Sequence, residues 1–344
     1  MRILSLPARH PYTSKFHQSG EIVFVNPGTD YFNKIGGYAN SEFIKKAHPP
    51  NTYDIVHIHF SFDKLGTDEL ETLLKYFKSI SKPIVWTCHS RESLRKRNIG
   101  NGILQRMLFS YADTLITPTN GCRKWIIDTY GNSKIITVIP LGYMADPKEV
   151  VVNSSFLKLK KKENFIYLVG DMRKNKEINL SISHFLNSGE LSDCKLTVIT
   201  KPIPEGIALD ERRREFWKTL HSSWRIHIIS QPEVSNEYLT QLFCQQHVCM
   251  LPYLWGTHSG QIELAKDCGC WPVISNVGFF KEQGAEIIEF NYSNNLSEFA
   301  DNLIGALIKA RNADLLSPQP ANREKEMNEI SRAHIQIYRS LLSR

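Results

Sequence analysis

Long apolar runs are missing from this sequence of 344 residues. No window approaches the ~18 consecutive apolar residues that a membrane-spanning helix requires, and the apolar stretch within residues 1–12 is too short for a signal peptide. The seven cysteines are odd in number and irregularly spaced, which argues against a disulfide framework. Because Cys268 and Cys270 have no second ligand pair at metal spacing, we expect core thiols there. We therefore expect a soluble, cytoplasmic protein.

Three common nucleotide-binding signatures are also missing: the dinucleotide fingerprint G-x-G-x-x-G, the phosphate loop G-x-x-x-x-G-K-[ST] and the metal-anchoring triplet D-x-D. A chain that binds an anionic nucleotide without them must use backbone amides, helix N-termini and basic side chains. The 42 Lys and Arg residues exceed the 35 Asp and Glu residues by seven. This mild excess suits an anionic ligand, but without a stripe of basic and aromatic residues we expect no nucleic-acid partner.

Short apolar runs alternate with helix-like segments along the chain, and its length suits about two domains. Because strands buried on both faces read as continuous β-branched runs, this alternation predicts parallel sheets covered by helices. Strands are predicted at 2–7, 21–26, 54–60, 83–89, 114–119, 135–140, 165–170, 195–200, 225–230, 247–253 and 271–276. Helices are predicted at 68–81, 102–112, 236–246 and 260–269, with a long amphipathic helix at the carboxyl terminus.

Residues 144–164 separate the two halves and contain proline, serine and a lysine run at 158–162. This composition predicts a solvated linker between two α/β domains. In such an arrangement the carboxyl ends of both sheets border a cleft between the domains, which is the default place for a ligand.

The strongest binding candidate is the strand–loop–helix segment at 247–276. Small residues at Gly256, Ser259 and Gly260 would let a phosphate approach the N–H groups at the start of the helix, where the helix dipole favours negative charge. Glu263, about one turn inside the helix, could accept two hydrogen bonds from a ribose diol. The alternative is an ordinary capping loop with a surface glutamate.

Several segments match, in order, the motifs of one enzyme family. In the loop segment the matching residues are Leu251, Pro252, Gly256, Glu263, Ala265, Gly269, Pro272, Val273 and Ile274, followed by SNVGFFKEQ (275–283). The other landmarks are YDIVHIHF (53–60), PIVWTCHS (83–90), ADTLITPTNGCRKWIIDTYG (112–131), KIITVIPLGY (134–143) and FIYLVGDMRKNK (165–176). With these motifs the chain resembles a glycosyltransferase of the GT-B fold, most similar to the large retaining family called GT4.

The resemblance implies an α/β fold with two Rossmann-like domains facing across a cleft. Residues 1–147 would bind the acceptor, residues 148–322 the donor, and a helix over 323–344 would pack back on the first domain. The implied reaction moves a hexosyl group from a nucleoside diphosphate sugar, of UDP or GDP type, to a hydroxyl of a glycan, a lipid-linked intermediate or a small molecule. Retention of configuration is implied as well, and we expect neither a metal ion nor a further cofactor.

The resemblance also implies roles for individual residues. Glu263 matches the glutamate that holds the nucleotide ribose, and His89 matches the catalytic histidine near the donor sugar. For His89 the alternative is a core histidine bonded to a carbonyl, and for Lys176 it is a surface lysine. The residues implied to bind the donor diphosphate are Arg173, Lys176, His258, Ser259 and Gly260.

The sequence departs from the family motifs at three places. Trp255 stands at the family's first glutamate, which contacts donor-sugar hydroxyls; an indole cannot accept those hydrogen bonds but can stack on a sugar face. Asp171 stands where the family has an arginine, which leaves Arg173 to supply the charge, and His258 replaces a glycine of the turn. A catalytically idle or repurposed nucleotide-sugar binding protein therefore stays an alternative, as does an epimerase with the same cleft.

The loop after the first predicted strand also differs from the Gly-Gly loop of the family. Arg9, His10, Tyr12 and Lys15 would face the cleft as candidates for donor-sugar or acceptor contacts, with a solvated loop as the alternative. The basic segment 91–97 suits an anionic acceptor, a membrane surface or simply a solvated helix face. Peripheral association with the inner face of the membrane therefore stays open.

Overall fold

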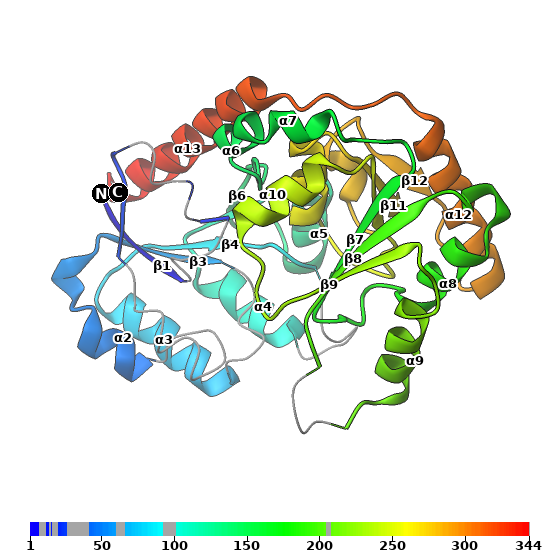
Figure 1. Ribbon diagram of the computed structural model, residues 1–344. Coiled ribbons are helices and arrows are strands. Elements are labelled where there is room, and N and C mark those ends of the chain that lie inside the picture. Colours follow the sequence, from blue (N-terminus) through cyan, green and yellow to red (C-terminus); the bar gives the residue numbers. More distant parts are fainter. Residues whose placement is uncertain are drawn as a thin grey trace. The chain divides into compact units, whose positions relative to one another are not determined.

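The computed structural model describes residues 1–6, 12–13, 15, 20–25, 41–59, 66–91, 101–203 and 208–343. These residues form two compact units (Figure 1). The first unit contains the described residues up to Gly142 and those from Lys325 onward, and the second is Tyr143–Glu324. The chain therefore passes from the first unit to the second at residue 143 and returns at residue 325.

The described part of the first unit contains a six-stranded parallel sheet in the order β2-β1-β3-β4-β5-β6. The pairing has a regular register, with Val56 of β3 opposite Ile84 of β4. Its strands are β1 (Arg2–Leu6), β2 (Val23–Val25), β3 (Ile55–His59), β4 (Ile84–Thr87), β5 (Thr114–Thr117) and β6 (Ile135–Val138). Its helices are α2 (Ser41–Ala47), α3 (Thr67–Ser79), α4 (Asn101–Tyr111), α5 (Asn120–Tyr130) and most of α13 (Pro320–Leu342).

The second unit has the same construction, with parallel strands in the order β12-β11-β10-β7-β8-β9. Its strands are β7 (Asn164–Gly170), β8 (Lys195–Thr200), β9 (Ile226–Ser230), β10 (Val248–Leu251), β11 (Trp271–Ser275) and β12 (Ile288–Phe290). Its helices are α6 (Pro147–Val152), α7 (Ser154–Leu157), α8 (Asn179–Asn187), α9 (Glu211–Leu220), α10 (Asn236–Cys244), α11 (Gly260–Asp267) and α12 (Leu296–Asn312). The predicted pair of Rossmann-like sheets is thus confirmed.

Buried apolar side chains explain why these segments form strands and helices. Every residue of β3, β4, β5 and β10 is buried, as expected for strands covered on both faces. Helix α3 buries Leu70, Leu73, Leu74 and Phe77, which recur at the spacing of one helix face. All eleven predicted strands are present, and β12 is an additional short strand.

The sheet of the second unit has a separate apolar core on each face. Helices α8, α9 and α12 contribute to one cluster, and α6, α10 and α11 contribute to the other. The strand order reverses between β7 and β10, which are neighbours in the sheet although the chain forms two other strands between them. Ligands of open α/β sheets bind at the carboxyl ends of the strands at such a switch point.

The segment 144–164 is not the solvated linker that its composition predicts. It forms α6 and α7, and Val150 of α6 is buried in the core. Lys160, within the lysine run, is buried and donates to the carbonyl oxygens of Cys268 and Gly269 at 2.9 and 2.7 Å. The two carbonyls replace the water that an ammonium group loses on burial.

All seven cysteines are free and buried. The prediction of core thiols for Cys268 and Cys270 is therefore confirmed. None of the helices in the described part of the chain combines the length and the apolar character needed to cross a bilayer.

Candidate functional site

Two loops of the second unit meet at the switch point of its sheet. The loop after β7 pairs with the loop after β10 through an antiparallel bridge between Lys176 and Tyr253. A backbone hydrogen bond from Glu177 N–H to the Pro252 carbonyl, 2.9 Å long, fixes the same contact. These contacts hold together two loops that are distant in the sequence.

Lys176 lies beneath these loops and is only 4% exposed, so the alternative of a surface lysine is wrong. Its Nζ donates to the Leu168 carbonyl at 2.8 Å and to Gln261 Oε1 at 2.7 Å. It also lies 5.7 Å from the ring centre of Tyr167 and 5.3 Å from that of Tyr253. Burial lowers the pKa of Lys176 to about 7. The lysine therefore gains or loses its charge near neutral pH, directly beside the first turn of α11.

The β10–α11 loop ends in a regular helix cap at Ser259. The Ser259 hydroxyl accepts a hydrogen bond from Gln261 N–H at 3.1 Å and lies 2.7 Å from the Tyr253 hydroxyl. A serine in this position satisfies one of the unpaired N–H groups of the first helical turn. The predicted helix start is confirmed, with Gly260 as its first residue.

The small residues of this loop make room for protein side chains. A Cβ added to Gly256 would lie 2.5 Å from Cζ of Phe280, and one added to Gly260 would lie 3.2 Å from Met144. Gly278 faces the Gly256 backbone and has a φ of +66°, a conformation that side-chain-bearing residues rarely adopt. Close packing against the 277–283 turn explains Gly256 and Gly278, and close packing against Met144 explains Gly260.

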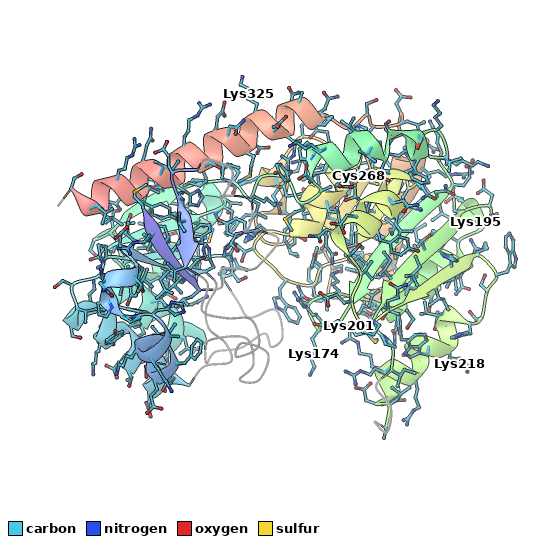
Figure 2. The ribbon with its side chains drawn as sticks, turned by 60° about the vertical axis from the view of Figure 1, so that its left-hand side comes forward. Lys174, Lys195, Lys201, Lys218, Cys268 and Lys325 are labelled. Carbon is cyan, nitrogen blue, oxygen red and sulfur yellow. The ribbon has the colours of Figure 1, made fainter. Side chains whose placement is uncertain are left out.

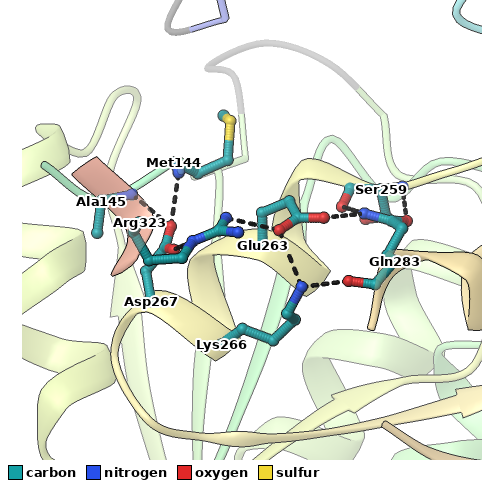
Figure 3. A network of polar contacts seen from close by, with 8 residues as sticks. All are labelled: Met144, Ala145, Ser259, Glu263, Lys266, Asp267, Gln283 and Arg323. Atoms are coloured by element: carbon teal, nitrogen blue, oxygen red, sulfur yellow. Dashed lines mark hydrogen bonds and ion pairs between the residues drawn. The ribbon is translucent and has the colours of Figure 1, made fainter. Parts of the chain in front are cut away.

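Gln283 makes a two-point contact with Ser259. Its Oε1 accepts from Ser259 N–H at 2.7 Å, and its Nε2 donates to the Ser259 carbonyl at 3.0 Å. Nε2 also donates to Glu263 Oε1 at 2.7 Å (Figure 3). The backbone amide predicted to bind a diphosphate is therefore hydrogen-bonded to Gln283 in this structure.

Glu263 is 5% exposed, so it is not a surface glutamate. Its Oε2 accepts from Arg323 Nη2 at 2.7 Å and from Lys266 Nζ at 3.2 Å (Figure 3). Burial acts to raise the pKa of Glu263, but the charges of Lys266 and Arg323 bring it below its ordinary value. Glu263 is therefore an ionised carboxylate at neutral pH.

Sequence reasoning missed Arg323 and Gln283. Arg323 comes from α13, sixty residues after Glu263, and Gln283 from the end of a short 3-10 helix after β11. No local pattern marks either residue, because their role depends on contacts between distant segments. The position of Gln283 in the 275–283 motif was the one available hint.

Trp255 and His258 lie in the same loop. Trp255 is 8% exposed, and its carbonyl accepts from Asn175 Nδ2 at 3.3 Å. Burial lowers the pKa of His258 to about 4, against the opposing effect of the Glu263 charge. His258 is therefore neutral at pH 7 and carries no positive charge there.

Asp171 is paired with a cation. Its carboxylate lies 2.9 Å from Lys201 Nζ, which offsets the repulsion expected from an acidic group near a phosphate. Arg173 is exposed, and with Lys174 and Lys201 it borders a cavity of about 430 Å³. Figure 2 labels these two lysines. The cavity is lined by Gly170, Asp171, Met172, Arg173, Lys174, Thr200, Lys201, Pro202, Ile203, Leu209, Arg213 and Trp217. Arg173 thus faces a different space from the buried Lys176.

A second polar group belongs to the first unit. His89 follows β4, and the Tyr12 ring packs edge-on against it at 4.6 Å. Tyr12 and Lys15 are 3% and 7% exposed, so a solvated loop is wrong for these two residues. Arg9 and His10 lie outside the described residues, as does nearly all of the basic segment 91–97.

A buried hydrogen-bonded group in the first unit joins β3, β4 and α13. His57 contacts Thr87 Oγ1 at 2.7 Å through Nε2 and Tyr338 Oη at 2.6 Å through Nδ1. Burial lowers the pKa of His57 well below its ordinary value. Across the described residues, His, Cys, Asp and Glu side chains form no group of three or more that could hold a metal ion.

Comparison with known proteins agrees with this architecture. Residues 6–146 match the family described as Glycosyltransferase Family 4. No curated protein matches the sequence.

Solved structures share the fold over most of the chain. Sucrose-phosphate synthase from Thermosynechococcus elongatus has a TM-score of 0.68 at 15% identity, covering 94% of this chain and 83% of its own. Anabaena HepE in complex with UDP and glucose has a TM-score of 0.65 at 11% identity, covering 99% and 100%. A UDP-forming trehalose-phosphate synthase from Burkholderia xenovorans has a TM-score of 0.60 at 16% identity, covering 88% and 76%. The predicted GT-B fold, with its resemblance to GT4-type glycosyltransferases, is thereby confirmed.

Proposed function

We propose that the chain is a glycosyltransferase that moves a hexosyl group from a nucleoside diphosphate sugar to an acceptor hydroxyl, with the second unit binding the donor. The observation that carries this proposal is the contact between Lys176 Nζ and Gln261 Oε1, because it joins a buried cation to the N-terminal turn of α11. A cation and a helix N-terminus together make a site for a phosphate. Glu263, one turn further on, supplies the ionised acceptor for a ribose diol.

UDP is the first donor nucleotide to test, with GDP second. The HepE structure contains UDP and glucose, and the Burkholderia synthase is described as UDP-forming. Both resemble this chain in fold. The acceptor is a hydroxyl of a glycan, a lipid-linked intermediate or a small molecule, and association with the inner face of the membrane is part of the same proposal.

The proposed reaction is a transfer with retention, without a metal ion. The bond between the sugar carbon and the diphosphate oxygen breaks, a new bond forms to the acceptor oxygen, and the acceptor proton passes to the leaving diphosphate. Lys176 and the N–H groups at 258–260 would stabilise the charge that develops on the leaving group. Arg173 is proposed to add charge from the neighbouring loop, and His89 stays the proposed catalytic residue of the first unit.

The test has two stages. Isothermal titration calorimetry with UDP, GDP, ADP and TDP should give binding to at least one nucleotide, weakened in Lys176→Met and Glu263→Gln. Matching nucleotide sugars are then assayed for release of the nucleoside diphosphate with and without candidate acceptors. Release that depends on an acceptor supports transfer; absence of binding to all four nucleotides refutes the proposal.

A nucleotide-sugar binding protein without transfer activity is the second candidate. The buried Trp255 favours it, since this residue replaces the glutamate that contacts the donor sugar in the family motif. This candidate predicts binding of the nucleotide sugar with no turnover for any acceptor. An epimerase would instead convert the donor when no acceptor is present.

A further inference from the structure

Arg323, in the first turn of α13, contacts two carboxylates of α11 at once. Its Nε donates to Asp267 Oδ1 at 2.6 Å, and its Nη2 donates to Glu263 Oε2 at 2.7 Å (Figure 3). The side chains of Arg323, Glu263 and Asp267 are only 13%, 6% and 2% exposed. A buried guanidinium shared by two carboxylates has little freedom to move.

Asp267 is itself fixed by the backbone. Its Oδ2 accepts from Met144 N–H at 2.6 Å and from Ala145 N–H at 3.0 Å, while its Oδ1 accepts from Arg323 (Figure 3). Met144 and Ala145 come directly after the point where the chain enters the second unit, and Arg323 lies just before the point where it leaves. Asp267 therefore connects Arg323 to the backbone of residues 144 and 145.

The two oxygens of Glu263 have different partners. Oε2 accepts from two cations, Arg323 and Lys266, whereas Oε1 accepts from the neutral Gln283. A carboxylate oxygen offers about two acceptor positions. Both acceptor positions of Oε2 are therefore occupied, by Arg323 and Lys266. Removing either cation would leave a buried carboxylate with less compensation for its charge, which is energetically costly. Among the described residues only Gln283 donates to Oε1, which leaves one acceptor position of this oxygen open; displacement of Gln283 would release the other.

We propose that Arg323 and Asp267 are positioning residues for the nucleotide: Asp267 orients Arg323, and Arg323 holds Glu263 so that Oε1 accepts the ribose hydroxyls. This inference rests on the proposed function, because it assigns Glu263 to a ribose. It adds to the donor site two residues that do not touch the nucleotide, one of them from the last helix of the chain. Lys266 assists because it donates to the second acceptor position of Oε2.

The test compares two ligands that differ only at the ribose. Dissociation constants are measured by calorimetry for UDP and for 2′,3′-dideoxyuridine 5′-diphosphate, which lacks both hydroxyls. Arg323→Lys keeps the charge but cannot bridge the two carboxylates, so we expect its Kd for UDP to rise about 10-fold, the size of one hydrogen bond to a charged group. The Kd of the dideoxy ligand should stay within twofold. Asp267→Asn should show the same selectivity with a smaller change.

Two controls separate positioning from general damage. Arg311→Lys alters an arginine that pairs with Asp193 elsewhere in the second unit, and it should change neither Kd. In a Glu263→Gln background, Arg323→Lys should have no further effect on UDP binding, because the residue through which it acts is already altered.

The outcomes are distinct. Equal losses for UDP and the dideoxy ligand, or no loss for either, would overturn the inference while leaving the proposed function standing. If the wild-type chain prefers GDP, the same pair of probes is built on guanosine. If it binds none of the four nucleotides, the proposed function fails and takes this inference with it.

Discussion

Replacing Gln283 by alanine is expected to make the chain bind UDP more tightly while making it less stable. In the proposed site, a diphosphate oxygen needs Ser259 N–H and a ribose hydroxyl needs Glu263 Oε1. Gln283 now contacts both atoms, each at 2.7 Å. It accepts from the amide as a phosphate oxygen would, and it donates to the carboxylate as a ribose hydroxyl would. A nucleotide must therefore displace this side chain before it makes the same contacts.

The magnitude follows from the three hydrogen bonds that displacement breaks: two with the Ser259 backbone and one to the Glu263 carboxylate. A neutral hydrogen bond contributes about 1 kcal/mol net and one to a charged group about 1.5–3 kcal/mol. Part of this loss is regained when the released amide contacts water, so we take about 1.5–2 kcal/mol as the cost of displacement. Gln283→Ala removes that cost, and Kd for UDP should fall about 10- to 30-fold. The free energy of unfolding without nucleotide should fall by about 1–2 kcal/mol.

Calorimetry with UDP and urea unfolding of the nucleotide-free chain measure the two quantities. The control is Gln319→Ala, because Gln319 is exposed and its side chain makes two long hydrogen bonds, to the Ser317 carbonyl at 3.4 Å and from Asn322 Nδ2 at 3.5 Å. It should leave both quantities unchanged. The reasoning is refuted if Gln283→Ala weakens UDP binding or leaves it unchanged, since Gln283 would then support the site rather than occupy it.

Three further predictions concern single buried groups. Burial lowers the pKa of Lys176 to about 7, and only its ammonium form attracts phosphate, so Kd for UDP should rise about tenfold per pH unit above pH 7. In calorimetry from pH 7 to 9, Lys176→Met should bind UDP weakly and without this pH dependence. If the variant keeps the pH dependence, the assignment to Lys176 is wrong. Lys160→Met removes the donor to two carbonyls at the end of α11 and should lower the free energy of unfolding in urea by about 2 kcal/mol. The control Lys161→Met changes an exposed lysine and should lower it by less than about 0.5 kcal/mol. Equal effects of the two variants would contradict a stabilising role of the buried contact. Burial lowers the pKa of His334 from 6.5 to about 4, so on acidification the unfolded chain takes up a proton before the folded chain does, and the free energy of unfolding should fall as the pH drops from 6.5 to 4. In urea titrations at several pH values, His334→Gln should reduce this pH dependence of the free energy of unfolding. An unchanged pH dependence would show that His334 does not contribute.

The predicted sheets agree with the structure because buried parallel strands leave a strong local signal. Short apolar runs identify all eleven predicted strands. β12 was missed because Ile288–Phe290 places a glutamate between only two apolar residues. The linker prediction failed for the opposite reason. Charged residues are solvated only on average. Lys160 is buried, and two carbonyls of a distant segment accept hydrogen bonds from its ammonium group. Asp146 followed by Pro147, a regular helix start, was the overlooked local signal for α6.

The candidate site could be predicted in part. The sequence placed Lys176, Ser259 and Glu263 in one site through motifs, and the structure holds the two loops together. It did not indicate that Asp171 pairs with Lys201, because that contact depends on the neighbouring position of β7 and β8 in the sheet. Family motifs identify residues that are expected to touch a ligand, whereas their supporting partners come from wherever the fold brings another segment close.

Helix α11 has features that its own sequence predicts and features that depend on tertiary contacts. Ser259, Glu263 and Asp267 are spaced by four residues, so they lie along one helix face, and this much is readable from the sequence. A face with two acids is ordinarily solvated, yet here Glu263 and Asp267 are buried. Gln283 covers the first part of this face and Arg323 the second. The polarity of the face is thus set by α11 itself, and Lys266 of the same helix supplies part of its charge balance. Its burial and its proposed role in binding a nucleotide depend on Gln283 and Arg323, which no periodicity connects to α11.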